Sequence, residues 1–534
     1  MDLAICAVLA VVELTLSRVS IMTDDNNVIL GQELKKFRAH NPIELQLDWS
    51  RRWPDTPFIR YFSIAGKEAL VVNSLAAHKA VLQTHVYDFV KPPFFTRLAG
   101  EIVGKGLLFA EGEDHRRERK LLAGPFSVPM TDTLSKSTMH TVGVTVLGVD
   151  LDALLSIYPR SFQELYSTVF DQEPLGGLIW VINAFVPIRR FVPLKANKRF
   201  IQANQDLREM LRDIVEKRNA DLRDGTFVRE MGESRDLLTY MLEESVLQQQ
   251  QTGREPWAVD DIVDHLLNFT AAGHETTADA ISWGLYVLST THEIQDQLRT
   301  EIRAFLMSHP EPTYEKINGL PYLHNFTREL LRVYSPAITS PRQASKDIVI
   351  EGVYIPKGTQ VDLQISLMHH RQEIWGPDAS NFNPDRWNKL AGDSASPYAF
   401  QAFIQGPRMC PGKNFAMIEI KVMLIELVSK WRFLGIERWD SAVMGEGSGE
   451  KKERDLLVGG EEAVGRGVKL ANPSLTFRPE GLSIRGGSET EVICYKEVFQ
   501  YVPLILLALG RLRYNDNQSS PAIILSERDW AGTF

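Results

Sequence analysis

Cysteine is scarce in this sequence, because the 534 residues include only Cys6, Cys410 and Cys494. An odd number of widely separated cysteines excludes the disulfide framework of a small secreted protein, and a reducing compartment is the simpler interpretation. A structural cysteine normally packs in an apolar core. Cys410 instead lies among turn-forming residues, in "GPRMCPGKNF", just before an expected helix. Its position therefore indicates a chemical function.

Long hydrophobic runs are also lacking. The apolar stretch over residues 3–16 contains Glu13 and is shorter than the roughly 20 residues that span a bilayer. Asp2 stands where a secretory signal peptide carries basic residues, and Arg18 favours a cytosolic position for the following flank. Residues 1–20 are thus expected to be either a weak or truncated membrane anchor or a plain apolar terminus.

An excess of basic residues is absent as well. The formal net charge is -9, whereas proteins that bind nucleic acids generally carry a basic surface that neutralises phosphates. With 44% apolar and 24% charged residues, the chain has the composition of a globular protein with a large core. We therefore expect no nucleic-acid partner, and any basic docking surface must be local.

The hydrophobic pattern favours helices over strands. Strand-like alternation is confined to residues 342–363 and 473–485, and residues 441–467 read as an exposed loop. The pattern therefore predicts a mainly α protein with small β-sheets, an α+β fold. Apolar residues at helical spacing occur over residues 204–218, 260–290, 294–307, 322–333 and 414–431.

The helix expected over Val259–Thr290 has an unusual centre. Gly273 and the hydroxyl residues Thr276 and Thr277 disfavour a regular helix and invite a local opening. Glu275 beside Thr276 supplies an acid and an alcohol suited to relaying protons. The alternative is a kink whose hydroxyl groups bond back to the helix.

Two charged residues share one face of the expected helix 322–333. Glu329 and Arg332 stand at i and i+3, and Arg386 in "FNPDRW" is a candidate third member. An exposed pair of this kind contributes about 0.2–0.5 kcal/mol. In a buried network, loss of one partner would cost roughly 3–5 kcal/mol. The sequence leaves both alternatives open.

Basic residues cluster in "EGEDHRRERKLL". His115 and Arg119 lie one helical turn apart and can point together at an anion, while Arg116, Arg117 and Lys120 face elsewhere. A solvated basic face is the alternative.

A second candidate membrane contact lies over residues 176–195. Aromatic and aliphatic residues there precede Arg189, Arg190 and Lys195, as in segments that rest among lipid headgroups. Burial in the core is the alternative.

Taken together, these motifs resemble one family, the cytochrome P-450 haem-thiolate monooxygenases, and their wording resembles its fungal microsomal type. The resemblance covers roughly residues 28–485. Three motifs and a further arginine carry it: F-x-x-G-x-R-x-C-x-G at Phe403, Gly406, Arg408, Cys410 and Gly412; A/G-G-x-D/E-T at Ala272, Gly273, Glu275 and Thr276; E-x-x-R at Glu329 and Arg332; and Arg386.

The resemblance implies a long central helix over haem b and assigns roles to individual residues. Cys410 would be the thiolate ligand of the iron, with Phe403 covering it and Gly406 and Gly412 letting the backbone turn tightly. Glu275 and Thr276 would deliver protons, and Gly273 would make room for oxygen. Candidates to neutralise the propionates are His115, Arg119, Arg342 and Arg408.

The resemblance also implies partners. A lipophilic small molecule would be hydroxylated or similarly oxidised with molecular oxygen, in fungal secondary metabolism, on the cytosolic face of the endoplasmic reticulum membrane. Electrons would come from NADPH through a reductase that docks near Arg116, Arg117, Lys120 and Lys413. The expected substrate-pocket residues are Phe94, Phe95, Thr270, Ala271, Ile338 and Thr339.

Three departures from the family pattern support an alternative. No proline precedes Pro42, residues 127–148 are short for the helices expected there, and residues 486–534 form an atypical tail. The alternative is a catalytically inactive or haem-deficient product of a damaged or mis-spliced gene.

Overall fold

The computed structural model describes most of the chain from residue 44 to residue 436. The described ranges are 44–63, 67–122, 143–149, 158–170, 187–227, 236–253, 255–309, 312–430 and 433–436, with shorter pieces at 19–21, 32, 35, 176, 179, 180, 182, 183, 469, 470, 479, 480, 483–486 and 492–494. The predicted anchor run, the shortened segment as far as residue 142 and most of the C-terminal tail lie outside these residues.

Helices dominate the described chain, as predicted. They include α3 (Glu44–Arg52), α4 (Leu75–Lys79), α5 (Pro93–Val103), α6 (Gly112–Leu121), α8 (Phe162–Phe170), α10 (Lys195–Arg223), α11 (Leu237–Thr252), α12 (Val259–Thr290), α13 (His292–Ser308), α14 (Tyr314–Asn318), α15 (Pro321–Val333), α16 (Ile365–His370), α17 (Gln372–Trp375) and α18 (Lys413–Lys430). Two π-helices are Ala80–Thr84 and Gly143–Leu147, and the 3-10 helices include Arg189–Phe191 and Pro384–Asn388.

One sheet of six strands supports these helices, in the order β1-β2-β3-β8-β5-β4. Strands β2 and β3 form an antiparallel hairpin, and β8 joins β3 in parallel and β5 in antiparallel pairing. The strands are β1 (Val19–Ile21), β2 (Phe58–Phe62), β3 (Glu68–Val72), β4 (Phe89–Val90), β5 (Thr339–Ala344) and β8 (Gln360–Gln364). Smaller sheets contain β6 (Ile348–Ile350), β7 (Val353–Ile355), β9 (Phe433–Ile436), β10 (Lys469–Leu470), β11 (Pro479–Glu480), β12 (Ser483–Gly486) and β13 (Val492–Cys494).

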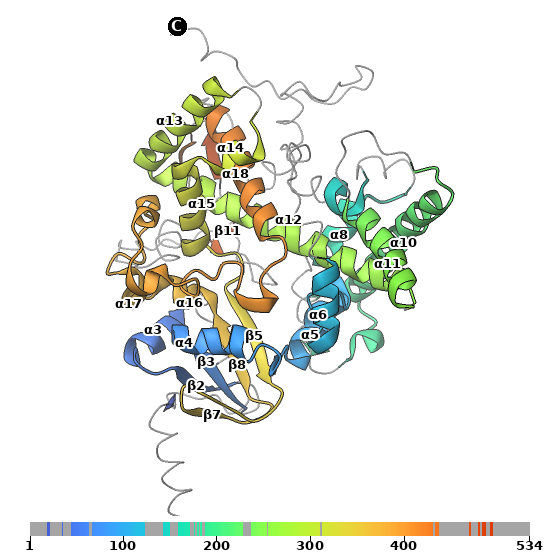
Figure 1. Ribbon diagram of the computed structural model, residues 1–534, viewed down its shortest axis with the longest axis horizontal. Coiled ribbons are helices and arrows are strands. Elements are labelled where there is room, and N and C mark those ends of the chain that lie inside the picture. Colours follow the sequence, from blue (N-terminus) through green and yellow to red (C-terminus); the bar gives the residue numbers. More distant parts are fainter. Residues whose placement is uncertain are drawn as a thin grey trace, which may run out of the picture.

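Helix α12 crosses the molecule between two groups of helices (Figure 1). The helices α13, α14, α15 and α18 lie around its C-terminal half, and α8, α10 and α11 lie around its N-terminal half. Asp260 and Asp261 in its first turn interact favourably with the helix dipole. The helix is continuous from Val259 to Thr290, so the local opening expected near Gly273 is not observed.

The core forms around α12 on both sides. Leu285, Leu288, Leu330 and Leu424 belong to one buried cluster that joins α12, α15 and α18. A second cluster joins α12 to α5, α8, α10 and α11. The first cluster contains α12 residues between 280 and 288, and the second contains α12 residues between 262 and 267. Because the two halves of α12 are buried in different clusters, this helix fixes the position of the elements around the site described below.

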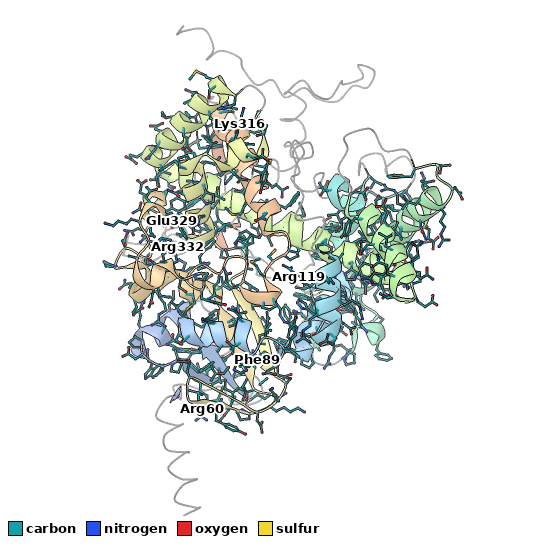
Figure 2. The ribbon with its side chains drawn as sticks, in the orientation of Figure 1. Arg60, Phe89, Arg119, Lys316, Glu329 and Arg332 are labelled. Atoms are coloured by element: carbon teal, nitrogen blue, oxygen red, sulfur yellow. The ribbon has the colours of Figure 1, made fainter. Side chains whose placement is uncertain are left out.

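The pair Glu329 and Arg332 lies in the core rather than on the surface. Both side chains have zero exposure, and Arg332 Nη2 lies 2.8 Å from Glu329 Oε1. Arg332 also donates to the carbonyl oxygens of His369 and Ala379, both at 2.6 Å. Arg386 Nε lies 3.3 Å from the same Glu329 oxygen, so the expected third member is present. Figure 2 shows Glu329 and Arg332 side by side.

Buried histidines in this region predict a pH-dependent stability. Burial, reinforced by the charge of Arg332, lowers the pKa of His370 to about 4, whereas an unfolded histidine titrates near 6.5. Its contribution to the free energy of unfolding is therefore complete above pH 6.5 and is lost as the pH falls toward 4, by about 1.4 kcal/mol per pH unit.

The variant His370→Gln lacks this titration. The difference in free energy of unfolding between wild type and variant, from urea titrations at pH 4.5 to 8, should be constant above pH 6.5. Below that pH the wild type should lose stability relative to the variant. A difference that does not depend on pH would contradict the assignment.

Candidate active site

A cavity of about 370 Å³ lies beside the centre of α12. Its wall combines α6, α12, β5, the start of α18 and the loop 402–412 that precedes α18. Most lining side chains are apolar, but Lys91, Arg119, Arg342 and Arg408 also line it. In the described part of the chain, no acidic residue lines the cavity.

Cys410 lies in this wall, at the end of the loop. Its N–H donates to the carbonyl oxygen of Phe403 at 2.8 Å, and the N–H of Met409 donates to Gly406 at 2.9 Å. These two bonds fold the loop so that Phe403 and Cys410 both reach the cavity. The predicted partners of the family motif are thus brought together.

The two glycines of the motif differ in what they contribute. Gly406 has a φ of 79°, and a Cβ atom there would overlap the carbonyl oxygen of Leu82, so the expected requirement for glycine holds. Gly412 has no positive φ, and a Cβ there would lie at an ordinary 3.9 Å from Cys410 Sγ. The backbone turns here, but neither its φ nor a close contact requires glycine at position 412. Ile404 has a φ of 56°, an unusual conformation for a β-branched residue.

Opposing effects act on the thiol of Cys410. Burial raises its pKa, while a hydrogen bond from the backbone of Gly412 and the positive charges of Arg119 and Lys413 lower it. Burial is the largest of these effects, so the pKa lies above its ordinary value. The Gly412 backbone and the two cations favour the thiolate, the form that binds a metal. A cation bound to the sulfur would also lower the pKa of the Cys410 thiol.

Positive charge accumulates on the side of the cavity near β5. Burial, followed by the charges of Arg342 and Arg408, lowers the pKa of Lys91 to about 7. Burial and the charge of Arg408 lower the pKa of Arg342 to about 10. Glu111 pairs with Arg408, lies 3.8 Å from Lys91 and also interacts electrostatically with Arg342, so one carboxylate faces three cations.

His115 and Arg119 extend this basic side from α6. Both line the cavity, so the two side chains lie together as a spacing of one helical turn allows, and Figure 2 shows Arg119 near the middle of the molecule. His115 Nδ1 lies 3.4 Å from the hydroxyl of Tyr87. Burial, followed by the charge of Arg408, lowers the pKa of His115 to about 4, so at neutral pH it is an uncharged hydrogen-bonding group.

These residues fit haem. Two propionates supply the negative charge that the buried cations lack, and Arg408 Nε is buried without a hydrogen-bond partner. An apolar wall suits the porphyrin, and the sulfur of Cys410 is the type of ligand that a haem-thiolate iron requires. Arg342, Arg408, Arg119, His115 and Lys91 would hold the propionates.

Thr276 and Glu275 take different positions on α12. Thr276 lines the cavity, and its hydroxyl donates to the carbonyl oxygen of Ala272 at 2.6 Å, which matches the alternative of a back-bonded hydroxyl. Glu275 is not among the described lining residues and instead accepts a hydrogen bond from Tyr166 at 3.4 Å. Gly273 lines the cavity within a regular helix.

The six residues expected in a substrate pocket are not among the described residues that line this cavity. The register of α12 explains two of them, because Phe269, Ala272 and Thr276 recur at helical spacing and place Thr270 and Ala271 on other faces. Phe95 packs in the second core cluster, Ile338 packs in the first, and Thr339 is exposed. Phe94 was also expected in the wall.

Several lining residues had no distinct sequence signal. Lys91 stands alone among apolar and proline residues, and Leu107 and Leu108 follow a glycine in a loop. Only the tertiary structure shows that these segments reach α12. The polar residue Asn268 could have been noticed as an exception within an apolar stretch of that helix.

The comparisons with known proteins agree with this site. A model of the family described as Cytochrome P450 matches residues 124–440, more than half of the chain. The chain is 28% identical over 441 residues to cytochrome P450 monooxygenase sphH of Aspergillus fumigatus, covering 73% of this chain and 78% of that protein. It is 28% identical over 483 residues to cytochrome P450 monooxygenase FUM15 of Gibberella moniliformis, with the same shares.

Similarity extends to plant proteins. The chain is 30% identical over 362 residues to a cytokinin hydroxylase of Arabidopsis thaliana, covering 64% of this chain and 68% of that protein. These matches and the cysteine-lined cavity lead to one conclusion: the chain belongs to the cytochrome P450 family and is a fungal-type monooxygenase.

Proposed function

We propose that this enzyme inserts one oxygen atom into a lipophilic small molecule of fungal secondary metabolism, using electrons from NADPH delivered by a reductase. The observation that carries the proposal is the single cavity wall that combines Cys410, Thr276 and a largely apolar surface. An apolar pocket with few polar groups suits a lipophilic ligand. The fungal relatives named as monooxygenases support the setting.

Bound haem would supply the oxygen and electron chemistry, and the protein would supply ligation, orientation and protons. Cys410 would hold the iron, while Arg342 and Arg408 would fix the propionates through charge-assisted hydrogen bonds. Phe403 would shield the sulfur from water. The oxygen of the Thr276 hydroxyl can accept a further hydrogen bond in the cavity. Glu275, the preceding residue on α12, would supply protons to this hydroxyl.

Isotope labelling tests this proposal. Purified protein, NADPH and a fungal P450 reductase would be incubated under ¹⁸O₂ with a panel of terpenoids, polyketides and fatty acids. We expect at least one product that contains a single ¹⁸O atom. Products whose new oxygen is unlabelled and therefore comes from water, or reductase-independent turnover, would contradict the proposal.

The substitution Thr276→Ala should uncouple oxygen consumption from product formation. It removes the hydroxyl that lines the cavity, while alanine preserves the helix. We expect product per NADPH consumed to fall about tenfold, since general acid–base groups contribute about 10²–10⁴-fold and part of the proton delivery would persist through water. Oxygen uptake and product yield measured together would check this, and unchanged coupling would remove Thr276 from the proton path.

For reductase docking, we propose the surface beside the cysteine loop. Lys413 begins α18 three residues after Cys410, and Lys120 is exposed on α6. Arg116 and Arg117 pair with Glu113 and Asp114, so their charge is partly neutralised. Lys120 and Lys413 are therefore the stronger candidates to attract an acidic partner surface.

For localisation, we propose the cytosolic face of the endoplasmic reticulum membrane. Among the residues that the structure describes, no helix is long and apolar enough to cross a bilayer. The candidate headgroup segment, residues 176–195, has a buried part and an exposed part. Trp180 and Arg189 are buried, and Arg189 pairs with Glu101 at 2.7 Å, whereas Phe191 and Leu194 are exposed beside the exposed Lys195.

The exposed part of this segment predicts a membrane-binding defect. Phe191 is 82% exposed, and burying such a side chain contributes about 1.5–3 kcal/mol. Phe191→Ser should therefore weaken binding to vesicles of phosphatidylcholine and phosphatidylserine by about tenfold or more. Met307→Ser is a matched control because Met307 is 81% exposed on α13. Equal binding by the two variants in a flotation assay would contradict the proposal.

A further inference from the structure

Three polar side chains of α12 bind a short loop between α5 and α6. We call Asp264, His265 and Asn268 the α12 clasp, and residues 104–108 the clasped loop. Each member of the clasp accepts a backbone N–H of the loop. The three bonds join Lys105 N to Asp264 Oδ2 at 2.7 Å, Leu107 N to His265 Nδ1 at 3.1 Å, and Leu108 N to Asn268 Oδ1 at 3.2 Å.

Two glycines allow the loop to lie this close to the helix. Gly104 has a φ of 74°, and a Cβ there would overlap the carboxylate of Asp264. A Cβ at Gly106 would lie 2.9 Å from Asn268 Nδ2 and 3.0 Å from the carbonyl oxygen of Asp264. The sequence of the loop is therefore fitted to the clasp at two positions.

Further bonds hold the clasp itself in place. Arg208 of α10 donates to Asp264 Oδ1 at 2.8 Å, so the bond to Lys105 uses the other oxygen. Asn268 Nδ2 donates to the carbonyl oxygens of Val103 at 2.6 Å and Asp264 at 2.8 Å. This amide thus binds both the loop and its own helix, which fixes its rotamer.

His265 is fixed by packing. Its ring lies 5.0 Å from that of Trp257, measured between centroids, and it is buried. Burial lowers its pKa to about 4, so Nδ1 is free to accept the Leu107 N–H at neutral pH. The carboxylate of Glu118 lies 3.9 Å from Nε2. The ring therefore occupies one tautomer with its acceptor toward the loop.

The clasped loop supplies part of the cavity wall. Leu107 and Leu108 both line the cavity, as do Asn268 and Phe269 from the facing turn of α12. The backbone of these leucines is bound to His265 and Asn268. While those hydrogen bonds hold, the backbone that carries the two side chains stays beside the cavity.

We propose that Asp264, His265 and Asn268 are positioning residues that determine ligand selectivity, because they hold Leu107 and Leu108 as a fixed apolar wall of the cavity. The selectivity part rests on the proposed function, in which this cavity receives a lipophilic ligand above haem. The clasp acts through the loop. Breaking it should widen the range of accepted ligands while leaving the attachment of the cofactor unchanged.

Hydrogen exchange tests the positioning. His265→Phe keeps an aromatic ring but removes the acceptor, and exchange of the peptide containing Leu107 should accelerate about tenfold or more, as loss of a buried hydrogen bond does. His265→Asn places an amide oxygen near the former Nδ1 position and should restore much of the protection. Asn325→Ala, which breaks a distant bond to Asn388, should leave this peptide unchanged.

Azole binding tests selectivity without turnover. Dissociation constants of the haem-loaded protein for imidazole and 4-phenylimidazole would be taken from absorbance titrations. Both compounds would bind the haem iron through the same type of imidazole nitrogen. The ratio of their dissociation constants therefore reports the wall around the phenyl ring. In His265→Phe, the preference for 4-phenylimidazole should fall about tenfold, and Asn325→Ala should retain it. His265 does not itself line the cavity, so a fall reports the position of the loop.

Each result decides one part of the proposal. Unchanged exchange of the Leu107 peptide in His265→Phe would overturn the positioning, and faster exchange with an unchanged azole ratio would overturn the role in selectivity. A chain that binds no haem would refute the proposed function, while the exchange experiment would still decide whether the clasp fixes the cavity wall.

Discussion

Arg332→Leu should yield little folded protein. The substitution removes the donor for two bonds to Glu329, at 2.9 and 2.8 Å, and for bonds to three backbone carbonyls. Breaking a buried pair costs about 3–5 kcal/mol, and each buried carbonyl left without a donor adds a further cost. The total free energy of unfolding of a domain is only about 5–15 kcal/mol, so the variant is close to unfolded.

Arg332→Lys separates the contribution of charge from that of geometry. Lysine keeps the charge but cannot form the two parallel bonds to Glu329, so it should rescue only part of the stability. Arg52→Leu is the surface control, because Arg52 and Asp48 pair at 2.7 Å with side chains 50% and 43% exposed, and such pairs contribute about 0–1 kcal/mol. Soluble yield and urea midpoints would compare them. Equal midpoints for Arg332→Leu and Arg52→Leu would refute the structural role.

Cys410→Ser should abolish monooxygenase activity while the chain still folds. Serine is only slightly smaller than cysteine. Cys410 bonds to Phe403 through its backbone N–H, which serine retains. The hydroxyl, however, is a poor source of the electron density that a thiolate gives to haem iron. The thiolate-type Soret band of the reduced carbon monoxide complex should disappear. Circular dichroism would verify folding, and a retained band would exclude Cys410 as the ligand.

Cys410→Ser and Arg332→Leu should fail in different ways. The first changes the chemistry of a folded chain, whereas the second prevents the fold that holds the loop 402–412 against α12. Measuring thermal unfolding of both variants beside their haem content would therefore distinguish loss of the ligand from loss of the scaffold.

Helices with long periodic patterns could be predicted from the sequence. The bounds expected for Val259–Thr290 coincide with those of α12, because an acidic first turn and a continuous apolar pattern define that helix locally. The mainly α fold and the family are likewise confirmed. Spacing brought His115 and Arg119 to one cavity, since a single helical turn relates them.

Features set by tertiary packing could not be predicted. Which face of α12 meets the cavity depends on the helices around it. The sequence predicts Thr270 and Ala271 in the wall, whereas the structure has Phe269 and Ala272 there. Burial of Glu329 and Arg332 likewise depends on α16 and the segment 379–386, which are distant in sequence. The domain bounds 28–485, the atypical tail and the damaged-gene alternative stay predictions.

The carbon monoxide difference spectrum of the reduced, purified wild-type protein tests whether Cys410, the buried cations and the apolar wall form a working haem-thiolate site. We expect a thiolate-type Soret band with about one haem per chain, as one cysteine-lined cavity requires. A purified, folded chain that holds no haem, or that shows only the band of a non-thiolate haem, would contradict the account.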